Sequence, residues 1–100
     1  PEKPYDLRAE KLPDGIFQLK WEAKNKENRV TYNVYRSSSE EFSTDDAENI
    51  LAVGLREPHV EFHIPDDDKA YYYYITVSDS YHNESEASVP AFFYHSETLK

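Results

Sequence analysis

The sequence predicts an all-β fold, a seven-stranded antiparallel Greek-key sandwich. Three observations support this prediction: apolar and polar residues alternate along most of the chain, aromatic residues make up 15% of it with nine Tyr and five Phe, and turn residues separate the alternating runs. Aromatic residues favour strands, and short alternating runs between turns are typical of a sandwich. One hundred residues is the size of one common domain, so residues 1–100 are expected to share one core.

Each strand follows from the side-chain period, because alternate residues of a strand share one face. A short first strand is predicted at residues 5–10. The second, at 15–23, is opened by the turn Pro13-Asp14-Gly15, and the third covers residues 30–35. The inward residues predicted for the second and third strands are Phe17, Leu19, Trp21, Ala23, Val30, Tyr32 and Val34.

Four more strands are predicted in the second half of the chain, at residues 50–55, 59–64, 71–79 and 87–94. The longest of these runs, 71–79, is expected to form a central strand. Pro90 cannot donate a ladder hydrogen bond, which places the last strand at a sheet edge or at a bulge. The inward residues predicted for the fifth and sixth strands are Val60, Phe62, Ile64, Tyr71, Tyr73, Ile75 and Val77.

The polar segment at residues 37–49 does not fit a strand. Phe42 is its one large apolar residue and is expected to pin the segment to the core. The sequence Ser-Thr-Asp-Asp at residues 43–46 predicts a cap for a single helical turn, with Thr44 or Asp45 accepting from backbone amides. Loops longer than about 12 residues are often binding loops, but a solvated crossover is the favoured interpretation here.

Charge and composition exclude several functions. Eleven Lys and Arg against twenty Asp and Glu give a formal net charge of -9, which repels phosphate backbones and acidic membranes. We therefore expect no nucleic-acid partner and no membrane insertion by this segment. The absence of Cys excludes disulfides, thiolate catalysis and Cys-ligated zinc. No charged-then-apolar leader is present at Pro1, so any export signal is expected outside these residues.

No catalytic site and no cofactor are predicted. The paired carboxylates at residues 45–46 and 66–68 lie in polar turns, and neither matches a calcium-binding loop. Residues 37–39 are serines without the G-x-S-x-G context of an activated nucleophile. Residues 83–85 match the N-glycosylation sequon, which we interpret as the polar turn before the last strand.

A metal site at His59, Glu61 and His63 is the sharpest chemical alternative. Residues two apart on a strand share a face at roughly 7 Å, so these side chains could supply three of the four ligands of zinc. They also fit a simpler interpretation, as the outward residues of a strand whose other face is core. We favour the second interpretation and predict no metal.

The order and spacing of three segments resemble the fibronectin type III domain, an immunoglobulin-like sandwich. The resemblance implies that Trp21 is the core Trp of the second strand. It also implies that the hydroxyl of Tyr71 bonds back to the corner at residues 66–68. The residues that carry the resemblance are Pro4, Leu7, Ala9 and Trp21, then Tyr32-Asn33-Val34-Tyr35-Arg36-Ser37, then Tyr71-Tyr72-Tyr73-Tyr74-Ile75-Thr76-Val77-Ser78-Asp79.

Two further segments, residues 49–53 and 79–88, resemble the C-terminal sandwich appended to bacterial glycoside-hydrolase-like TIM-barrel proteins. This resemblance implies an extracytoplasmic protein, secreted, periplasmic or in the cell envelope of bacteria. It also implies that the catalytic carboxylates lie in a barrel outside this chain. Such domains often carry Gly where His82 stands, since the turn there can require a positive φ.

Three classes of function are compared on this basis. The favoured class is a spacer or docking module that contacts a neighbouring domain of the same polypeptide, with Phe92, Phe93 and Tyr94 as the apolar surface. The alternative is a module that binds polysaccharide or mediates adhesion. An enzyme would need a concave pocket with perturbed acid or base groups, and the sequence motifs give no sign of one.

The alternative class rests on Tyr35, Tyr72 and Tyr74, which are predicted to point outward from neighbouring strands and to form one exposed cluster. Cross-strand aromatic pairs stabilise a sheet, and an exposed platform of rings could also stack on a sugar. We favour stabilisation and domain contact, because a sugar site also needs convergent polar groups to fix the ligand.

Overall fold

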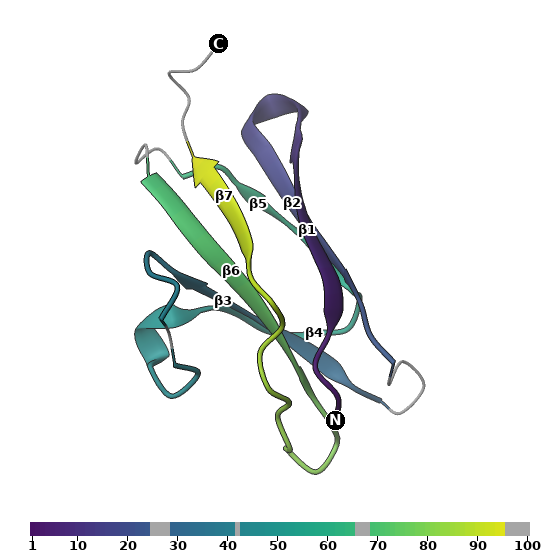
Figure 1. Cartoon of the computed structure of the whole chain (residues 1–100). Helices are drawn as coiled ribbons and strands as arrows, with labels where there is room; N and C mark the ends of the chain where they lie inside the picture. The colour runs from purple at the N-terminus through teal and green to yellow at the C-terminus, as the bar shows by residue number, and fades with distance from the viewer. Residues whose placement is uncertain (25–28, 42, 66–68, 96–100) are drawn as a thin grey trace.

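The computed structural model describes residues 1–24, 29–41, 43–65 and 69–95. All strand pairs in this part of the chain are antiparallel, and they form a three-stranded sheet, β1-β2-β5, and a four-stranded sheet, β4-β3-β6-β7. The two sheets face each other (Figure 1). This confirms the predicted sandwich and, for the described residues, its seven strands. They are β1 (Tyr5–Leu12), β2 (Ile16–Glu22), β3 (Thr31–Ser37), β4 (Ile50–Leu55), β5 (His59–His63), β6 (Lys69–Ser78) and β7 (Ala91–His95).

The core fills the space between the two sheets and consists of the inward residues of β2, β3 and β6. Phe62 and Tyr71 are partly buried and pack against it. Burial of alternate residues from facing sheets is the arrangement that removes most apolar surface from water in a sandwich. The fully enclosed large side chains include Trp21, Tyr73, Phe17, Leu19, Ile75, Val34 and Val77, and Tyr32 is 2% exposed.

Phe17 of β2 is the centre of an aromatic cluster that joins the two sheets. Its ring centroid lies 5.5 Å from that of Phe62 on β5, within the same sheet. Across the core it lies 5.3 Å from Tyr73 and 5.0 Å from Phe93, stacked on the latter. Rings at these separations attract one another beyond their area of burial, so the cluster fixes how the sheets meet.

The predicted turn at Pro13-Asp14-Gly15 forms a short 3-10 helix between β1 and β2. Asp14 and Gly15 both adopt positive φ, 66° and 72°. Asp tolerates the left-handed region better than most residues and Gly populates it freely. The local sequence therefore determines where the first hairpin reverses.

The last strand is shorter than the 87–94 predicted, because β7 begins only at Ala91. Ser85 and Ser88 attach the preceding segment to the side of β6. The Ser85 N–H donates to the Val77 carbonyl (2.8 Å) and its Oγ accepts from the Val77 N–H (2.9 Å), and Ser88 binds Ile75 in the same way. The Ser85 and Ser88 hydroxyls replace backbone carbonyls as acceptors for the N–H groups of β6. The alternation of apolar and polar residues therefore does not predict how this segment pairs with β6. β7 does lie at a sheet edge, as Pro90 indicates.

The helical turn predicted near residues 43–46 exists one step later, as a 3-10 turn at Ala47–Asn49. Its cap is Asp46, whose Oδ1 accepts from the Glu48 N–H at 3.4 Å, so the assignment to Thr44 or Asp45 is wrong. An N-cap must directly precede the first helical residue, and Asp46 holds that position. The predicted anchor Phe42 lies outside the described residues.

Candidate functional site

The outer face of the four-stranded sheet contains the side chains that the sequence singled out for contact with a ligand or partner. The register places Tyr35 of β3 opposite Tyr74 of β6, and Tyr72 between Ser37 and Phe92. Alternation then turns Tyr35, Tyr72, Tyr74, Phe92 and Tyr94 away from the core. The rings of Tyr35, Tyr72 and Tyr74 therefore lie on one face of neighbouring strands, as predicted.

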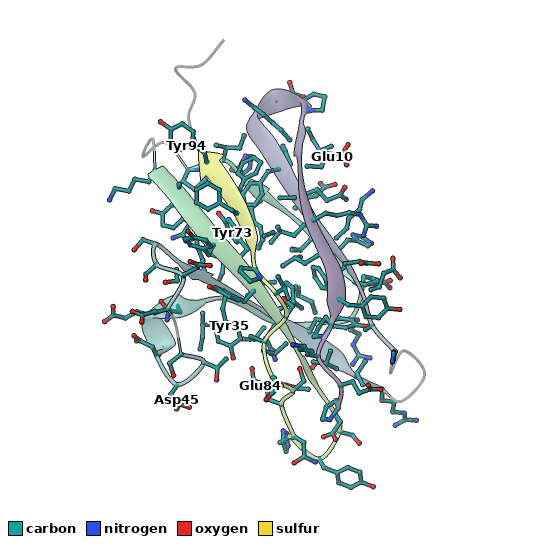
Figure 2. The ribbon with its side chains drawn as sticks, viewed as in Figure 1. Glu10, Tyr35, Asp45, Tyr73, Glu84 and Tyr94 are labelled. Atoms are coloured by element: carbon teal, nitrogen blue, oxygen red, sulfur yellow. The ribbon has the colours of Figure 1, made fainter. Side chains whose placement is uncertain are left out.

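The expectation that these rings form an exposed platform is wrong for Tyr35 and Tyr74, each of which is 4% exposed. The Tyr74 hydroxyl donates to the Glu40 carbonyl at 2.7 Å, so the loop after β3 contacts this part of the sheet, while residues 38–41, 43 and 45–48 of the loop are exposed, as expected of a solvated crossover. The Tyr35 hydroxyl donates to the carboxylate of Glu84 from the connection between β6 and β7 (Figure 2). Neither ring is available to stack on a sugar.

Glu84 completes a polar network on this face that sequence reasoning missed. Its Oε2 also accepts from Thr76 Oγ1 at 2.6 Å. The Asn33 side-chain amide donates to Thr76 at 3.0 Å and to Ser78 at 2.9 Å. Because Thr76 is fully enclosed and Asn33 is 8% exposed, these bonds satisfy polar groups that would otherwise be costly to bury.

Burial and nearby carboxylates keep the two tyrosines of this face protonated. Burial, and next the hydrogen bond to the Glu84 carboxylate, raise the pKa of Tyr35 to about 12. Burial, and next the nearby Glu40 carboxylate, raise the pKa of Tyr74. A phenol with a raised pKa stays neutral at physiological pH and is a poor base or nucleophile. The network is therefore suited to holding the two loops on the sheet.

The exposed aromatic surface lies beside this network, at the β7 side of the sheet. Phe92 is 58% exposed and Tyr94 is 49% exposed, while Tyr72 is half-buried. The rings of Tyr72 and Phe92 lie 5.0 Å apart and are tilted by 58°. We call Tyr72, Phe92 and Tyr94 the β7 patch. It retains one residue of the predicted platform and two of the predicted docking surface.

Phe93 does not belong to that surface. It alternates with Phe92 and Tyr94, faces the core and stacks on Phe17 at 5.0 Å with an interplanar angle of 18°. Its prediction as a contact residue is wrong because three consecutive aromatic residues of a strand cannot all face the same side.

His59, Glu61 and His63 lie on the outer face of the other sheet and are exposed. Gln18 of β2 lies opposite Glu61 and donates to its carboxylate at 3.5 Å, and Lys20 lies opposite His59. Among the described residues no group of three or more His, Cys, Asp or Glu is arranged to hold a metal ion.

We predict that calorimetric titration with zinc at neutral pH shows no saturable heat in the micromolar range. The physical reason is that His59 and His63 are four residues apart on one strand, roughly 13 Å along its axis, which is too far for both imidazoles to reach one ion at the 2.0–2.1 Å of a Zn–N bond without distortion of the strand. A one-to-one isotherm that His63→Ala abolishes would contradict this prediction.

The corner predicted for Tyr71 involves residues 66–68, which lie outside the described residues. Within the described part of the chain, the Arg36 guanidinium carbon lies 4.4 Å from the centroid of the Tyr71 ring. A cation over a ring face is a stabilising contact. The hydrogen bond of the Tyr71 hydroxyl to the corner stays a prediction.

The turn after β6 is ordered by Asp79. Its Oδ1 accepts from the backbone N–H groups of Tyr81 and Asn83, both at 2.9 Å, and hydrogen bonds from Asn83 lower the pKa of the Asp79 carboxyl. His82 adopts a φ of 66°, so the turn requires the positive φ that Gly provides in similar domains.

An open hollow is lined by residues 1–7 together with Lys24, Glu86, Val89 and Pro90. Its lining contains carboxylates, lysines and prolines but no Ser, Cys or His. In the described part of the chain no helix has the length and apolar character required to cross a bilayer.

Comparison with known proteins shows the fold. A fibronectin type III-like protein from Clostridium thermocellum superposes with a TM-score of 0.71 at 22% identity, covering 92% of this chain and 90% of its own. Domains A168–A170 of titin superpose with a TM-score of 0.71 at 14% identity. Pectate lyase Pel3 from Pectobacterium carotovorum superposes with a TM-score of 0.66 at 17% identity. This chain spans 32% and 28% of the lengths of those two structures. No protein-family profile and no curated protein sequence matches. The fold is fibronectin type III-like.

Proposed function

We propose that this chain is a non-catalytic accessory domain, a spacer or docking module, of a secreted or envelope-associated bacterial protein that acts on carbohydrates. The observation that carries the proposal is the β7 patch. Two of its rings are about half exposed on a chain whose net charge is -9. An exposed apolar patch with polar surroundings marks a surface that another molecule covers.

Two features support a contact within the same polypeptide. The patch consists of two adjacent strands in regular register, β6 and β7, so its shape is fixed before contact and little ordering entropy opposes docking. The similarity to one part of a pectate lyase chain shows that a sandwich of this shape occurs in a larger protein named for action on a polysaccharide. Fold similarity does not transfer that activity, and our proposal assigns it to another domain.

A glycan-binding module is the second candidate, and the exposure of Phe92 and Tyr94 favours it, since flat exposed rings can stack on sugars. The support for a glycan-binding function is weaker in the structure than it was in the sequence. Tyr35 and Tyr74 are covered, and the polar groups of Asn33 and Thr76 are used within the network. The patch therefore has few free polar groups to orient a sugar.

A Tyr72→Ala, Phe92→Ala double variant tests both candidates. In the full-length parent polypeptide we expect this variant to increase the maximum dimension measured by small-angle scattering, because the domain is released from its neighbour. Neither the wild type nor the variant is expected to be retained on insoluble glycans. A Glu61→Ala, His63→Ala variant on the opposite sheet is the matched control and should change neither measurement.

If the wild type is clearly retained on glycans and the double variant is not, then the chain is a glycan-binding module and the docking proposal is wrong. Unchanged scattering together with absent retention would contradict both.

A further inference from the structure

The loop after β3, residues 38–49, is strongly acidic, and we call it the acidic loop. No Lys or Arg occurs between Arg36 and Arg56, and all five charged residues between them are carboxylates of this loop. They are exposed, and they are Glu40, Glu41, Asp45, Asp46 and Glu48. None of them forms an ion pair with another described residue. The described part of the domain therefore leaves this negative charge without a cationic partner.

The acidic loop borders the β7 patch on the outer face of the four-stranded sheet. It leaves β3 after Ser37, which lies opposite Tyr72, and Tyr72 in turn lies opposite Phe92. Two residues further along β6, the Tyr74 hydroxyl donates to the Glu40 carbonyl at 2.7 Å. Burial, and next the Glu40 carboxylate, raise the pKa of Tyr74, so that carboxylate is close to the face. The loop therefore begins beside Tyr72, on the side away from Phe92.

The outer face thus changes from apolar at β7 to acidic at the loop. Figure 2 shows Tyr94 toward one end of the face and Asp45 toward the other. Phe92 is 58% exposed at the apolar end. An apolar centre with a polar border is the usual anatomy of a surface that contacts another protein.

We propose that the partner of the β7 patch is a protein surface with apolar residues at its centre and Lys or Arg along the border that meets the acidic loop. This inference rests on the proposed function, because it describes the neighbouring domain that the patch would contact. Charge complementarity supports it. Carboxylates that lie close together in one loop repel one another, and basic residues of a partner would relieve that repulsion.

The charge of the loop disfavours other occupants of the patch. A second copy of this chain would bring its own net charge of -9 to the contact, so two copies would repel each other. A neighbouring domain with an acidic border would be repelled for the same reason. A neutral sugar could stack on Phe92, but it would leave the charge of the adjacent loop unbalanced.

The rings and the carboxylates are expected to contribute differently to the contact. Buried rings supply most of the affinity of an interface, whereas exposed charge pairs at its rim add little affinity and mainly select the partner and its orientation. The acidic loop borders the patch on the β3 side, opposite β7. A partner with one basic border therefore meets the loop in one orientation, which would fix how the neighbouring domain sits on the sheet.

Small-angle scattering of the full-length parent polypeptide in increasing salt tests the charge of the partner. We expect the maximum dimension of the wild type to increase as NaCl rises from about 0.02 to about 0.5 M, because salt screens the attraction between exposed opposite charges. An apolar contact alone is not weakened by such screening. A maximum dimension that stays constant over this range would contradict the basic border.

A Glu40→Gln, Glu41→Gln variant tests whether the acidic loop causes the salt response. Gln keeps the size of Glu, and the Tyr74 hydroxyl binds the backbone carbonyl of residue 40, so the loop can stay attached to the sheet. At low salt we expect the ratio of docked to open parent, obtained from the scattering profile, to fall by about threefold to tenfold. At high salt the variant and the wild type should differ little.

A Glu10→Gln, Glu61→Gln variant is the matched control. It removes the same amount of charge from exposed positions of the other sheet, where both residues lie opposite Gln18. We expect this control to respond to salt as the wild type does. If it weakens docking as much as the loop variant, then the net charge of the chain and not the acidic loop causes the effect, and the inference is wrong.

The remaining outcomes separate this inference from the proposed function. If the Tyr72→Ala, Phe92→Ala variant opens the parent, but neither salt nor the loop variant does, then the patch docks as proposed and its partner lacks the basic border. If the patch variant leaves the scattering unchanged, then the docking function and the basic partner are both wrong. A scattering mass twice that of the parent, lost in the patch variant, would identify a second copy as the occupant and would also overturn the inference.

Discussion

Replacement of Trp21 with Ala is expected to lower the free energy of unfolding by about 3 to 5 kcal/mol, the range for removing a large aromatic side chain from a packed core. Trp21 is 1% exposed, and its ring meets Tyr32 of the opposite sheet edge-on with centroids 5.4 Å apart. The loss therefore combines burial, cavity formation and a contact between the two sheets. Urea melts of wild type and variant, compared at equal m-value, measure it.

Trp21→Phe distinguishes packing from hydrogen bonding at this position. The indole Nε1 is enclosed and has no hydrogen-bond partner among the described residues. Replacement with Phe therefore removes no hydrogen bond to a described residue. We expect Trp21→Phe to retain more than half of the stability that Trp21→Ala loses. If Trp21→Phe lowers the free energy of unfolding as much as Trp21→Ala does, then aromatic packing does not account for the stabilisation and the indole N–H contributes to it.

Stability is expected to fall as the pH rises from about 10 to about 12, and Tyr35 is expected to cause much of the fall. The ordinary tyrosine pKa is 10.0, and burial together with the Glu84 hydrogen bond raises the pKa of Tyr35 to about 12. Between these values the unfolded chain has lost the phenolic proton while the folded chain retains it. Unfolding then releases a proton, so each step up in pH favours the unfolded state.

The size of this effect follows from the shift, since one pKa unit corresponds to about 1.4 kcal/mol. The contribution of Tyr35 is fully present below pH 10, and about 2 to 3 kcal/mol of it is lost by the time the pH passes the folded pKa. Urea melts at intervals between pH 9 and pH 12 measure the slope. Burial also raises the pKa values of Tyr32 and Tyr74, so part of the slope is expected to persist without Tyr35.

Tyr35→Phe removes the ionisable group and should make the alkaline slope shallower. The same change at Tyr81, which is 83% exposed, is the matched control and should leave the slope unchanged. If Tyr35→Phe and wild type lose stability in parallel up to pH 12, then the phenol of Tyr35 is not responsible for the alkaline loss.

The β6–β7 connection is a segment whose structure the alternation of apolar and polar residues does not predict. Strand β6 was predicted because its alternation is local, and its inward residues Tyr73, Ile75 and Val77 are enclosed. The segment 84–88 has no such period, since Ser85 and Ser88 bind β6 through side chain and backbone together. Ser and similar residues can replace backbone partners in this way, and only the neighbouring strand decides whether they do.

The sequence predicted some residues of the candidate site and missed others, because their positions depend on neighbouring strands. The sequence analysis assigned Phe92, Phe93 and Tyr94 to one apolar surface, and only the strand boundaries of β7 showed that Phe93 faces the core while the other two face outward. It also could not identify Glu84, because the residues that bind its carboxylate lie 8 and 49 positions away. A bond over such a separation depends on how the strands and loops are assembled, and a single sequence carries no local signal for it.

The sandwich, the positions of most strands and inward residues such as Trp21, Val34 and Ile75 could be predicted from the sequence, because side-chain period and turn chemistry act over a few residues. Which outward residues meet water could not be predicted in this way. Tyr35 and Tyr74 point away from the core and are still buried, and their hydroxyls bind Glu84 and Glu40, which lie in the connections after β6 and β3. Exposure depends on what packs above a sheet, and that packing is set by contacts far apart in the chain.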